Sequence, residues 1–576
     1  MTHRYLNHMT EPLSISSTAR PALLITLLVA ALFLIRLTGP SDLMDFGQEA
    51  PTAYVLDAVK NGHWIVQRDA IGNITSKPPL YTWLAAAVST ITGEVNRWTL
   101  CAPAALATWA LALVILTTGI KYFGRRAGLL AALMYVLSQV VAKQVALVRT
   151  DGLFSLTVAL TALLAYRAWQ NGKGWELFWL AAAAATLTKG PLGIVLGASG
   201  LLAAWWERRT GSPAIIKGKH WTGIFLFLAI VLGWFGLAYW DVGRALTDRL
   251  LVRELYGRAV STGKGSAMLV GFYLPTLYFL ARFAPWSIAC LVGLWRVVKW
   301  PSPDAGQRRF ERFLFCWFAA GLVIFSLAAH HRADLLFPLV PPAALLAGRE
   351  LARWLAAWSD RRLTVVSVAL SLLFLIAVGL NFHMARLWLK KEESVAQTLA
   401  AEKLADIVHE KVGVGFPLVH QRTSPVMQLR LGTYNPLVTA ERAAQLLQSS
   451  AAAFVAVRDA DAMFARLPTN SFHILAEVPR TERTHMAILG NRPVLAWSDP
   501  LVTLIGPLQL EMSGIRKFER RANEFWFENE SHSAYVEVTN ESDKTISARV
   551  HFTGSGAATS EDIVVPAGGT RKVTCK

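Results

Sequence analysis

The chain has 576 residues, of which 53% are hydrophobic and only 17% are charged, and its mean hydropathy is +0.38. This composition is too apolar for a soluble protein of this length and predicts several membrane-spanning helices. The net charge of +18 is typical of a membrane protein with basic cytoplasmic loops, so we expect membrane lipid, and no nucleic acid, among its partners. The four cysteines show no metal-ligand spacing, which argues against a disulfide framework or a zinc site.

Apolar runs follow one another along the first two thirds of the chain. They lie near residues 21–38, 99–120, 127–145, 152–168, 175–188, 190–205, 220–240, 268–298, 311–329, 334–350 and 362–384. The two runs within 175–205 can form a short hairpin and 268–298 can break at Pro285, so the sequence predicts about 11–13 spans. The first run is expected to be a retained anchor, not a cleaved signal peptide, with residues 1–20 in the cytoplasm.

Four basic segments set the predicted orientation of these spans. They are residues 121–126, 205–209, 296–312 and 349–362. Because cytoplasmic loops carry an excess of Lys and Arg, we place all four in the cytoplasm. Alternation then places residues 39–98, 146–151, 241–267 and 330–333, and everything after about 385, on the opposite face. The alternation of spans is consistent with these assignments only if the helix predicted at 78–93, which follows Pro78 and Pro79, lies along the membrane interface and does not cross the membrane.

The composition changes after residue 385, where the transmembrane module at 21–385 ends. Residues 386–500 alternate predicted helices and strands, such as the helix at 395–409 and the strand at 412–420, and predict a small α/β domain. From 501 to 576 the pattern of alternating apolar and polar residues predicts a small β-sandwich. Both domains are expected on the extracytoplasmic face.

Charged residues near a membrane are costly, so those of the external segments are candidates for function. In the first loop, 39–98, we expect Asp57, Lys60, Arg68 and Asp69 to be solvated, and Asp45, Glu49 and Lys77 to be functional. The candidate catalytic residues are Asp45, Glu49 and Asp151, and the candidates for binding a phosphorylated donor are Lys77, Arg149, Glu254, Arg258, Lys264, His331 and Arg332.

This set of residues predicts a particular chemistry. A carboxylate near the lipid boundary can take the proton of an attacking hydroxyl. Clustered Arg and Lys can hold a phosphate and stabilise it as a leaving group. A substrate with a phosphate at the interface and an apolar tail in the bilayer fits this layout, and a sugar linked to polyprenyl phosphate is such a substrate. No metal or other cofactor is predicted, because no ligand spacing supports a divalent ion.

Several motifs in residues 20–385 resemble the polytopic, lipid-phosphate-dependent glycosyltransferases of the GT-C class. This class includes the protein O-mannosyltransferases and the transferases that add 4-amino-4-deoxy-L-arabinose to lipid A. The motifs are SKPPLYTW (76–83), VRTDGLF (148–154), TKGPLGIVL (188–196), ARFAPWS (281–287) and HRADLLFPLVPP (331–342), together with Glu254 followed by Arg258.

The resemblance implies roles for individual residues. Lys77, Arg258 and Arg332 would bind the lipid phosphate, and Asp151 would position the acceptor or its sugar. The first loop should supply the base, usually the first of an Asp-Glu pair, but here Gln48 and Glu49 stand at that place. The base is then Glu49 or the displaced Asp45, with Asp45 slightly favoured. Ser76 stands where relatives often carry an acid, which weakens a metal or amino-sugar role.

The sequence thus predicts an inner-membrane glycosyltransferase, inverting, with an undecaprenyl-type phosphate sugar as donor. The acceptor is expected to be a lipid A-like glycolipid, a glycan or a protein on the periplasmic face. One alternative is a membrane-anchored binding protein whose catalytic site has degenerated at Gln48. A lipid or sugar transporter is a weaker alternative, because the ionisable groups gather at one face and no repeat is evident.

Overall fold

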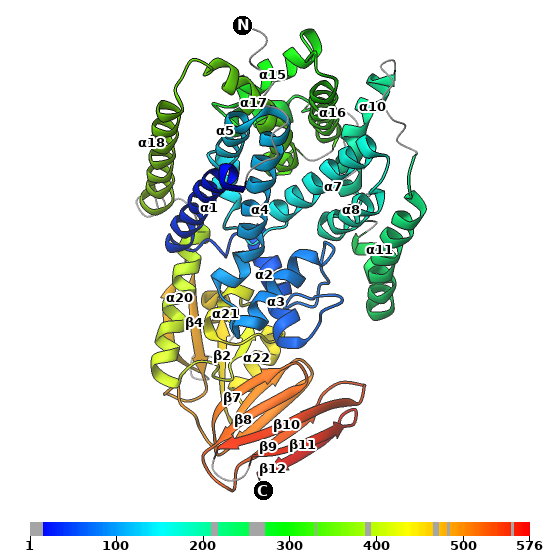
Figure 1. Ribbon diagram of the computed structural model, residues 1–576. Helices are drawn as coiled ribbons and strands as arrows, with labels where there is room; N and C mark the ends of the chain where they lie inside the picture. Colours follow the sequence, from blue (N-terminus) through cyan, green and yellow to red (C-terminus); the bar gives the residue numbers. More distant parts are fainter. Residues whose placement is uncertain are drawn as a thin grey trace. The chain divides into compact units, whose positions relative to one another are not determined.

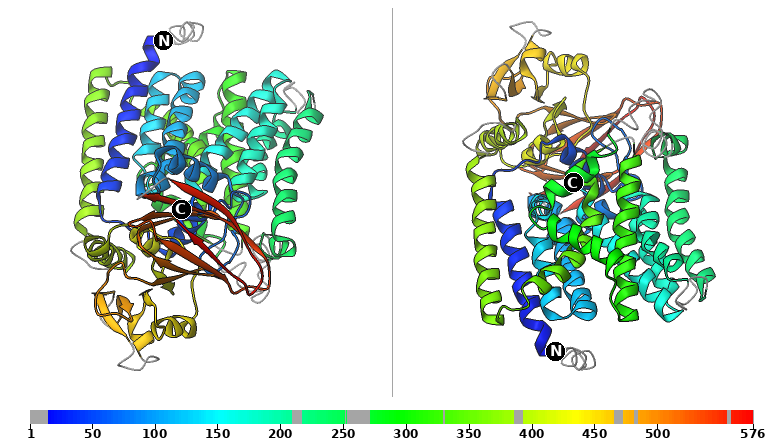
Figure 2. Two further views of the ribbon diagram at one scale, coloured as in Figure 1. Left: turned by 90° about the horizontal axis from the view of Figure 1, so that it is seen from below. Right: turned by 90° about the horizontal axis from the view of Figure 1, so that it is seen from above.

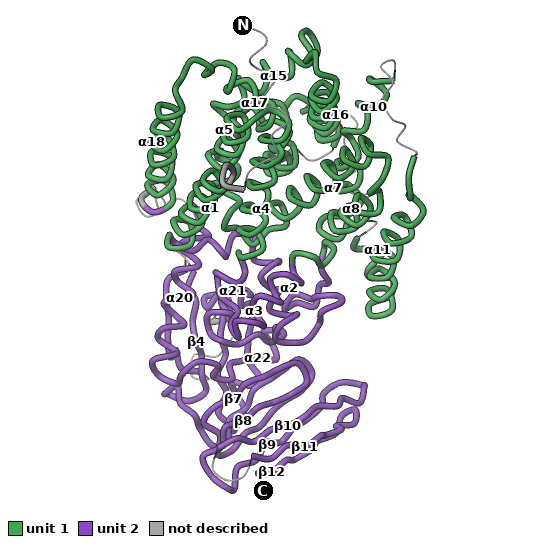
Figure 3. The backbone as a smooth tube through the Cα atoms, viewed as in Figure 1, with its two compact units in different colours: residues 1–39, 76–81, 101–382 green, residues 40–75, 82–100, 383–576 purple. Residues whose placement is uncertain are grey.

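The computed structural model describes residues 15–208, 217–250, 252, 271–328, 331–385, 393–464, 472–480, 484–554 and 558–575. The chain forms two compact units (Figure 3). Unit 1 comprises residues 1–39, 76–81 and 101–382, and unit 2 comprises residues 40–75, 82–100 and 383–576.

Unit 1 is a bundle of helices (Figure 1). Its helices are α1 (Ile15–Thr38), α4 (Arg97–Phe123), α5 (Arg125–Val136), α6 (Gln139–Gln144), α7 (Asp151–Asn171), α8 (Trp175–Lys189), α9 (Leu192–Ala198), α10 (Leu202–Trp206), α11 (His220–Val242), α12 (Arg244–Thr247), α14 (Leu274–Arg282), α15 (Ser287–Lys299), α16 (Ala305–Leu327), α17 (Val340–Trp354) and α18 (Asp360–Gly379). Short 3₁₀ segments η2 (Ser199–Leu201) and η5 (Ala333–Leu339) and the π-helical η6 (Leu380–Ala385) complete it.

Each of the eleven predicted apolar runs overlaps one or more helices within the described residues. By length and composition, seven helices among the described residues can cross a membrane, or eight when the bent pair α14 and α15 counts as one span. The break predicted at Pro285 is confirmed, because α14 and α15 meet there at 119°. Other runs are divided into helices shorter than the ~20 residues that a bilayer needs, so the count of 11–13 spans stays a prediction.

Small residues let the helices of unit 1 approach closely. A Cβ added at Gly348 of α17 would lie 2.6 Å from the backbone nitrogen of Ala131 in α5. Where lipid surrounds a bundle, such small-residue contacts replace the hydrophobic effect as the means of packing helices together. Helices α1 and α18 also lie side by side (Figure 2), and the Arg36 guanidinium lies 3.6 Å above the Phe382 ring.

The polar segments of unit 1 sort to two ends. The four basic segments meet at one end, because Arg126 pairs with Asp360 at 2.7 Å, Arg312 pairs with Glu207, and Arg349 pairs with Glu311 at 2.5 Å. At the start of α7, contacts join residues 76–81, 143–151 and 332–334. Within unit 1 this agrees with the predicted grouping of loops, whereas the assignment of the basic end to the cytoplasm stays a prediction.

Unit 2 is built on sheets and short helices. Its helices are α2 (Phe46–Asn61), α3 (Leu80–Thr92, which begins in unit 1), α20 (Glu393–Val412), α21 (Pro425–Leu431), α22 (Ala440–Leu447) and α23 (Ala460–Phe464). Its strands are β1 (Val419–Gln421), β2 (Ala452–Val457), β3 (His473–Pro479), β4 (His485–Gly490), β5 (Leu501–Ile505), β6 (Leu508–Ser513), β7 (Ile515–Arg521), β8 (Glu524–Asn529), β9 (Tyr535–Asn540), β10 (Ile546–Gly554), β11 (Thr559–Val565) and β12 (Thr570–Thr574).

Two sheets form from these strands. One has the order β12-β9-β6-β5-β2-β4-β3, with β1 also paired to β2, and the other has the order β11-β10-β8-β7. Strand β2 is buried on both faces, whereas β6, β8 and β9 alternate between buried and half-buried residues, as expected for a central strand and for strands with one covered face. Strands β2 and β5 pair in parallel, so the first sheet continues through the domain boundary predicted at residue 500. The domain bounds themselves stay a prediction.

The first loop contributes α2 and a turn to unit 2. Asp57 is only 2% exposed and accepts hydrogen bonds from Asn61 Nδ2, His63 Nδ1 and the Arg68 backbone at 2.7, 3.1 and 2.7 Å. The prediction that Asp57 is solvated is therefore wrong, because its carboxylate holds the loop together from inside. Asp69 forms a turn instead, accepting from the backbone nitrogens of Ile71 and Asn73.

Candidate active site at the start of helix α7

A cluster of charged side chains lies where α7 begins. Five elements of unit 1 supply it: the segment before α3, α6, the start of α7, the end of α8, and η5. We call it the aspartate cluster and define it as Lys77, Lys143, Arg149, Asp151, Lys189, Arg332 and Asp334. All seven residues belong to unit 1.

Asp151 is the buried carboxylate of this cluster. It opens α7, its residue is 8% exposed, and it forms an ion pair with Lys189 at the last position of α8. Lys77 reaches the neighbouring residue, its Nζ lying 3.4 Å from Thr150 Oγ1. The Tyr81 hydroxyl, in turn, donates to the Leu147 carbonyl at 3.2 Å. The segment that follows Pro78 and Pro79 is thereby fixed against the start of α7.

Asp334 in η5 is the second carboxylate. Its oxygens lie 3.4 Å from Lys143 Nζ, 3.3 Å from Arg149 Nη1 and 3.7 Å from Arg332 Nη2. Arg149 stands two residues before Asp151 in the chain. Its contact with Asp334 therefore brings η5 to the start of α7.

The aspartate cluster has a surplus of positive charge and a gradient of exposure. Five cationic side chains stand against two carboxylates. The side chains of Lys189 and Arg149 are 12% exposed, whereas those of Lys143 and Arg332 are 39% and 64% exposed. An anion that reaches the exposed side meets cations that are partly desolvated, where charge-assisted hydrogen bonds are strong. The geometry therefore suits the binding of a phosphate.

The structure brings together four of the predicted site residues, namely Lys77, Arg149, Asp151 and Arg332. His331 instead donates from Nε2 to the Ser326 carbonyl at 3.2 Å. Glu254, Arg258 and Lys264 lie outside the described residues. Asp45 and Glu49 belong to unit 2.

Three members of the cluster were not among the predicted residues. Lys189 is the lysine of TKGPLGIVL and Asp334 is the acid of HRADLLFPLVPP, so both lie inside the motifs that carry the family resemblance. Those motifs are the signal that could have identified them. Lys143 lies in an apolar run with no such signal.

The two candidate bases in unit 2 have different surroundings. Asp45 caps α2, accepting from the Gly47 nitrogen at 2.7 Å. Glu49, one turn further on, lies 3.4 Å from Arg458 Nη1. Burial raises the pKa of the Glu49 carboxyl above its usual 4.5, although the Arg458 guanidinium acts in the opposite direction. Gln48 between them is buried and donates to the Asp42 carbonyl at 3.0 Å, which is a structural contact.

Among the described residues, no three His, Cys, Asp or Glu side chains are grouped so that they could hold a metal ion.

Comparison with known proteins places this geometry in context. Residues 76–235 match the family described as dolichyl-phosphate-mannose-protein mannosyltransferase. Over 334 residues the chain is 24% identical to undecaprenyl phosphate-alpha-4-amino-4-deoxy-L-arabinose arabinosyl transferase 1 of Pseudomonas fluorescens, covering 55% of each protein. The chain thus spans about half the length of that curated relative.

Two solved structures share the fold over most of the chain. ArnT from Cupriavidus metallidurans bound to undecaprenyl phosphate aligns with a TM-score of 0.59 at 16% identity, covering 84% of this chain and 100% of ArnT. The apo state of the same protein aligns with a TM-score of 0.60 at 17% identity, covering 83% and 99%. The chain is therefore a multi-span membrane protein with the fold of the GT-C glycosyltransferases, and the resemblance predicted from its sequence is confirmed.

Proposed function

We propose that this protein is a membrane glycosyltransferase that moves a sugar from a polyprenyl monophosphate donor to an acceptor hydroxyl. The observation that carries the proposal is the aspartate cluster, in which five cations surround Asp151 and Asp334 at one end of a bundle with the ArnT fold. Such a cluster suits a phosphate whose lipid tail remains in the bilayer.

The reaction needs one displacement. The acceptor oxygen forms a bond to the anomeric carbon as the bond from that carbon to the phosphate oxygen breaks, which inverts the sugar. The electron pair leaves with the lipid phosphate, and Lys77 and Arg149 would stabilise its added negative charge. Asp151, held by Lys189, would position the sugar or the acceptor.

The proton of the acceptor goes to a carboxylate of the first loop. The contacts in unit 2 support Asp45 over Glu49, because Glu49 is engaged by Arg458, whose Nη2 also donates to Gln397 at 2.9 Å. A carboxylate oxygen engaged by Arg458 is less available to the acceptor hydroxyl, so we assign the base to Asp45.

By this proposal the donor is an undecaprenyl-type phosphate sugar, and the acceptor is a lipid A-like glycolipid, a glycan or a protein. The protein would lie in a bacterial inner membrane with unit 2 in the periplasm. The sorting of basic segments to one end of unit 1 supports this orientation.

Donor turnover tests the proposal directly. Purified protein in lipid nanodiscs receives radiolabelled polyprenyl phosphate sugars and an envelope extract as the source of acceptor, and label leaving the donor lipid is counted. We expect transfer by the wild type, loss of transfer in Asp45→Asn and Asp151→Asn, and a smaller loss in Glu49→Gln. Asp543→Asn, at an exposed position of unit 2, is the matched control.

The outcomes separate the two candidate functions. Transfer that survives all three substitutions would contradict the assigned roles. Absence of transfer with any donor, while undecaprenyl phosphate still binds, would favour the degenerate binding protein.

Binding of the donor lipid is measured separately from turnover. Lys77→Ala should weaken undecaprenyl phosphate binding by about tenfold, because one charge-assisted contact is lost. Lys173→Ala, which removes an exposed lysine of the same unit, should leave the affinity unchanged. An equal affinity for Lys77→Ala and wild type would remove Lys77 from the phosphate site.

A further inference from the structure

A cavity of about 240 Å³ lies within unit 2, away from every residue assigned above. Three parts of the unit form its walls: the end of α2, the turns after α20 and α21, and strand β7. The end of α2 is anchored there, because the Ala522 nitrogen after β7 donates to the Lys60 carbonyl at 2.5 Å.

The cavity wall is positively charged. Lys60, Lys517 and Arg520 line it together with one carboxylate, Glu519. That carboxylate is occupied by Arg521, whose Nε and Nη2 lie 3.0 and 3.2 Å from its two oxygens. Glu519 also interacts with Lys60 and Lys517, and the buried Asp57 acts on Arg520. The three cations still outnumber the one carboxylate of the wall, so an anion is the complementary ligand.

Arg520 is the most informative of these cations. Its guanidinium is largely buried, and burial lowers its pKa to about 10, so it remains charged at neutral pH. Its Nε donates to the Ala522 carbonyl at 3.2 Å and its Nη1 to Asn435 Oδ1 at 3.4 Å. Within the part of the chain that the structure describes, Nη2 makes no hydrogen bond. This nitrogen is open to solvent, so it is available to a ligand of the cavity.

The remaining wall offers backbone and neutral polar groups. Gly415 and Gly432 have φ angles of +80° and +77°, and a Cβ on Gly432 would lie 2.6 Å from Val414 Cγ1. Bare peptide groups therefore line this side, beside the hydroxyl of Thr433, which lies 2.8 Å from His420 Nε2, and the amide of Asn435, whose oxygen accepts from Arg520. Such groups match sugar hydroxyls. The volume lies below the roughly 300–1,000 Å³ of typical ligand pockets, so it suits a single phosphorylated ring.

We infer that this cavity is a binding site for a phosphorylated sugar, with Lys60, Lys517 and Arg520 receiving the phosphate and Thr433 and Asn435 the ring. The site does not depend on the proposed transfer reaction, because all of its residues lie in unit 2 and none has a role in the chemistry proposed above. If that reaction holds, the cavity would hold the sugar head of a phosphorylated acceptor.

Equilibrium binding to the full-length protein in nanodiscs tests the inference. The probe is glucose 1-phosphate, compared with glucose and with inorganic phosphate, and heat of binding is the readout. We expect saturable binding of glucose 1-phosphate that is about tenfold weaker in the double variant Lys60→Gln/Lys517→Gln. Val414→Trp, at a rim position that is 63% exposed, should fill the opening and weaken binding without disturbing the core.

Two controls decide where the probe binds. Arg571→Gln removes a cation from the exposed strand β12 and should leave the affinity unchanged. Lys77→Ala reports instead any binding of the probe at the aspartate cluster of unit 1. Loss of binding in Lys77→Ala, with none in the cavity variants, would overturn the inference whether or not the protein transfers sugar.

The other probes test the ligand class. Inorganic phosphate binding as tightly as glucose 1-phosphate would show that the ring is not recognised. Glucose binding equally well would show that the cations play no part. Either result, or no saturable binding at millimolar probe, would overturn the assignment of a phosphorylated sugar.

Discussion

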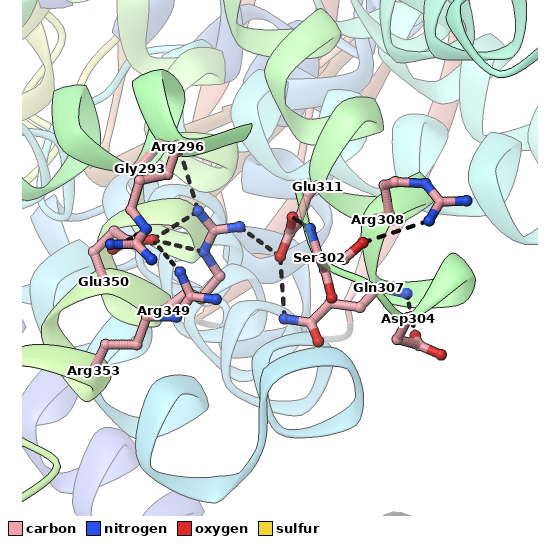
Figure 4. Close-up of polar contacts among 10 residues, drawn as sticks. All are labelled: Gly293, Arg296, Ser302, Asp304, Gln307, Arg308, Glu311, Arg349, Glu350 and Arg353. Atoms are coloured by element: carbon pink, nitrogen blue, oxygen red, sulfur yellow. Dashed lines mark hydrogen bonds and ion pairs between the residues drawn. The ribbon is translucent and has the colours of Figure 1, made fainter. Parts of the chain in front are cut away.

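Unit 1 contains two clusters of charged residues that differ in how completely they are closed. The first is the aspartate cluster, whose two carboxylates are Asp151 and Asp334. The second cluster consists of Arg296, Glu311, Arg349, Glu350 and Arg353, on helices α15, α16 and α17 (Figure 4), and we call it the arginine cluster. The segment from η5 to the end of α17 joins the two, because Asp334 lies at one end of it and Arg353 at the other.

The arginine cluster is a closed network. Arg349 lies 2.5 Å from Glu311 and 2.7 Å from Glu350, and it also donates to the Gly293 carbonyl at 3.3 Å. Glu350 further receives Arg353 at 3.2 Å and Arg296 at 3.6 Å. The residues Arg349, Glu311 and Glu350 are 4%, 1% and 0% exposed. Glu311, Arg349 and Glu350 thus have their counterions inside the protein. The surplus of one positive charge falls on Arg296 and Arg353, which are 35% and 40% exposed.

The two clusters differ in degree. Both combine several cations with two carboxylates, but the aspartate cluster has five cations and the arginine cluster has three. The most exposed cation is Arg332 at 64% in the first cluster and Arg353 at 40% in the second. We therefore expect substitutions in the arginine cluster to change stability and those in the aspartate cluster to change activity.

The largest effect is expected from Glu350→Gln. It leaves three arginines beside a neutral side chain in a buried place, and removing one partner of a buried ion pair typically costs about 3–5 kcal/mol. The melting temperature in nanodiscs should fall, while donor turnover per folded molecule stays at the wild-type level. Asp360→Asn is the matched control at the same end of unit 1. Its pair with Arg126 is exposed and such pairs contribute about 0–1 kcal/mol. Equal melting temperatures for the two variants would contradict the structural role of Glu350.

Asp151→Asn is expected to change activity. The amide keeps the shape of the carboxylate but loses the charge that holds Lys189, so the sugar or acceptor is misplaced. Turnover per folded molecule should fall by about a hundredfold, and the melting temperature should fall as well because the buried Lys189 loses its partner. A combined measurement of kcat and of undecaprenyl phosphate affinity separates positioning from binding. Loss of affinity with kcat unchanged would make Asp151 a binding residue only.

The two clusters also mark what the sequence could and could not reveal. The helices were predictable because the apolar runs are local patterns, and α7, α11 and α18 fall where the runs do. The bend at Pro285 was predictable for the same reason. Lys77 and Asp151 were identified because they lie in motifs that the sequence displays directly.

Partners that come from distant segments were not predictable. The pairing of Asp151 with Lys189, and of Asp334 with Arg149, depends on how five elements of the bundle meet. Burial of Asp57 was missed because it depends on a turn that folds back over the carboxylate. Continuation of the sheet from β2 to β5 likewise requires tertiary pairing across the domain boundary predicted at residue 500.

Salt provides a smaller test of the same comparison. Charges near the surface are screened as the Debye length falls from about 10 Å at 0.1 M to about 3 Å at 1 M salt, whereas buried pairs are screened much less. Raising the salt should therefore weaken undecaprenyl phosphate binding severalfold and leave the melting temperature nearly constant. Lys143→Gln, which removes a half-exposed cation, should make binding less sensitive to salt. A melting temperature that falls as steeply as the affinity would mean that the arginine cluster is open as well.

The smallest effect is expected from Glu49 in unit 2. Its carboxylate is either a structural one, like that of Glu350, or a catalytic one. Its pairing with Arg458 resembles the closed arrangement around Glu350, and burial raises its pKa above the usual 4.5. The folded protein then holds this proton more tightly than the unfolded chain. The resulting stability is fully present below the unfolded pKa and is lost as the pH rises through the raised folded value.

The melting temperature of the wild type should consequently fall by a few degrees relative to that of Glu49→Gln between about pH 4 and about pH 7. Turnover by Glu49→Gln should remain well above that of Asp45→Asn over the same range, since a carboxylate committed to Arg458 is not the base. A flat melting difference, combined with loss of turnover in Glu49→Gln alone, would reverse this assignment. Glu49 would then be the proton acceptor, and Asp45 would serve only to cap α2.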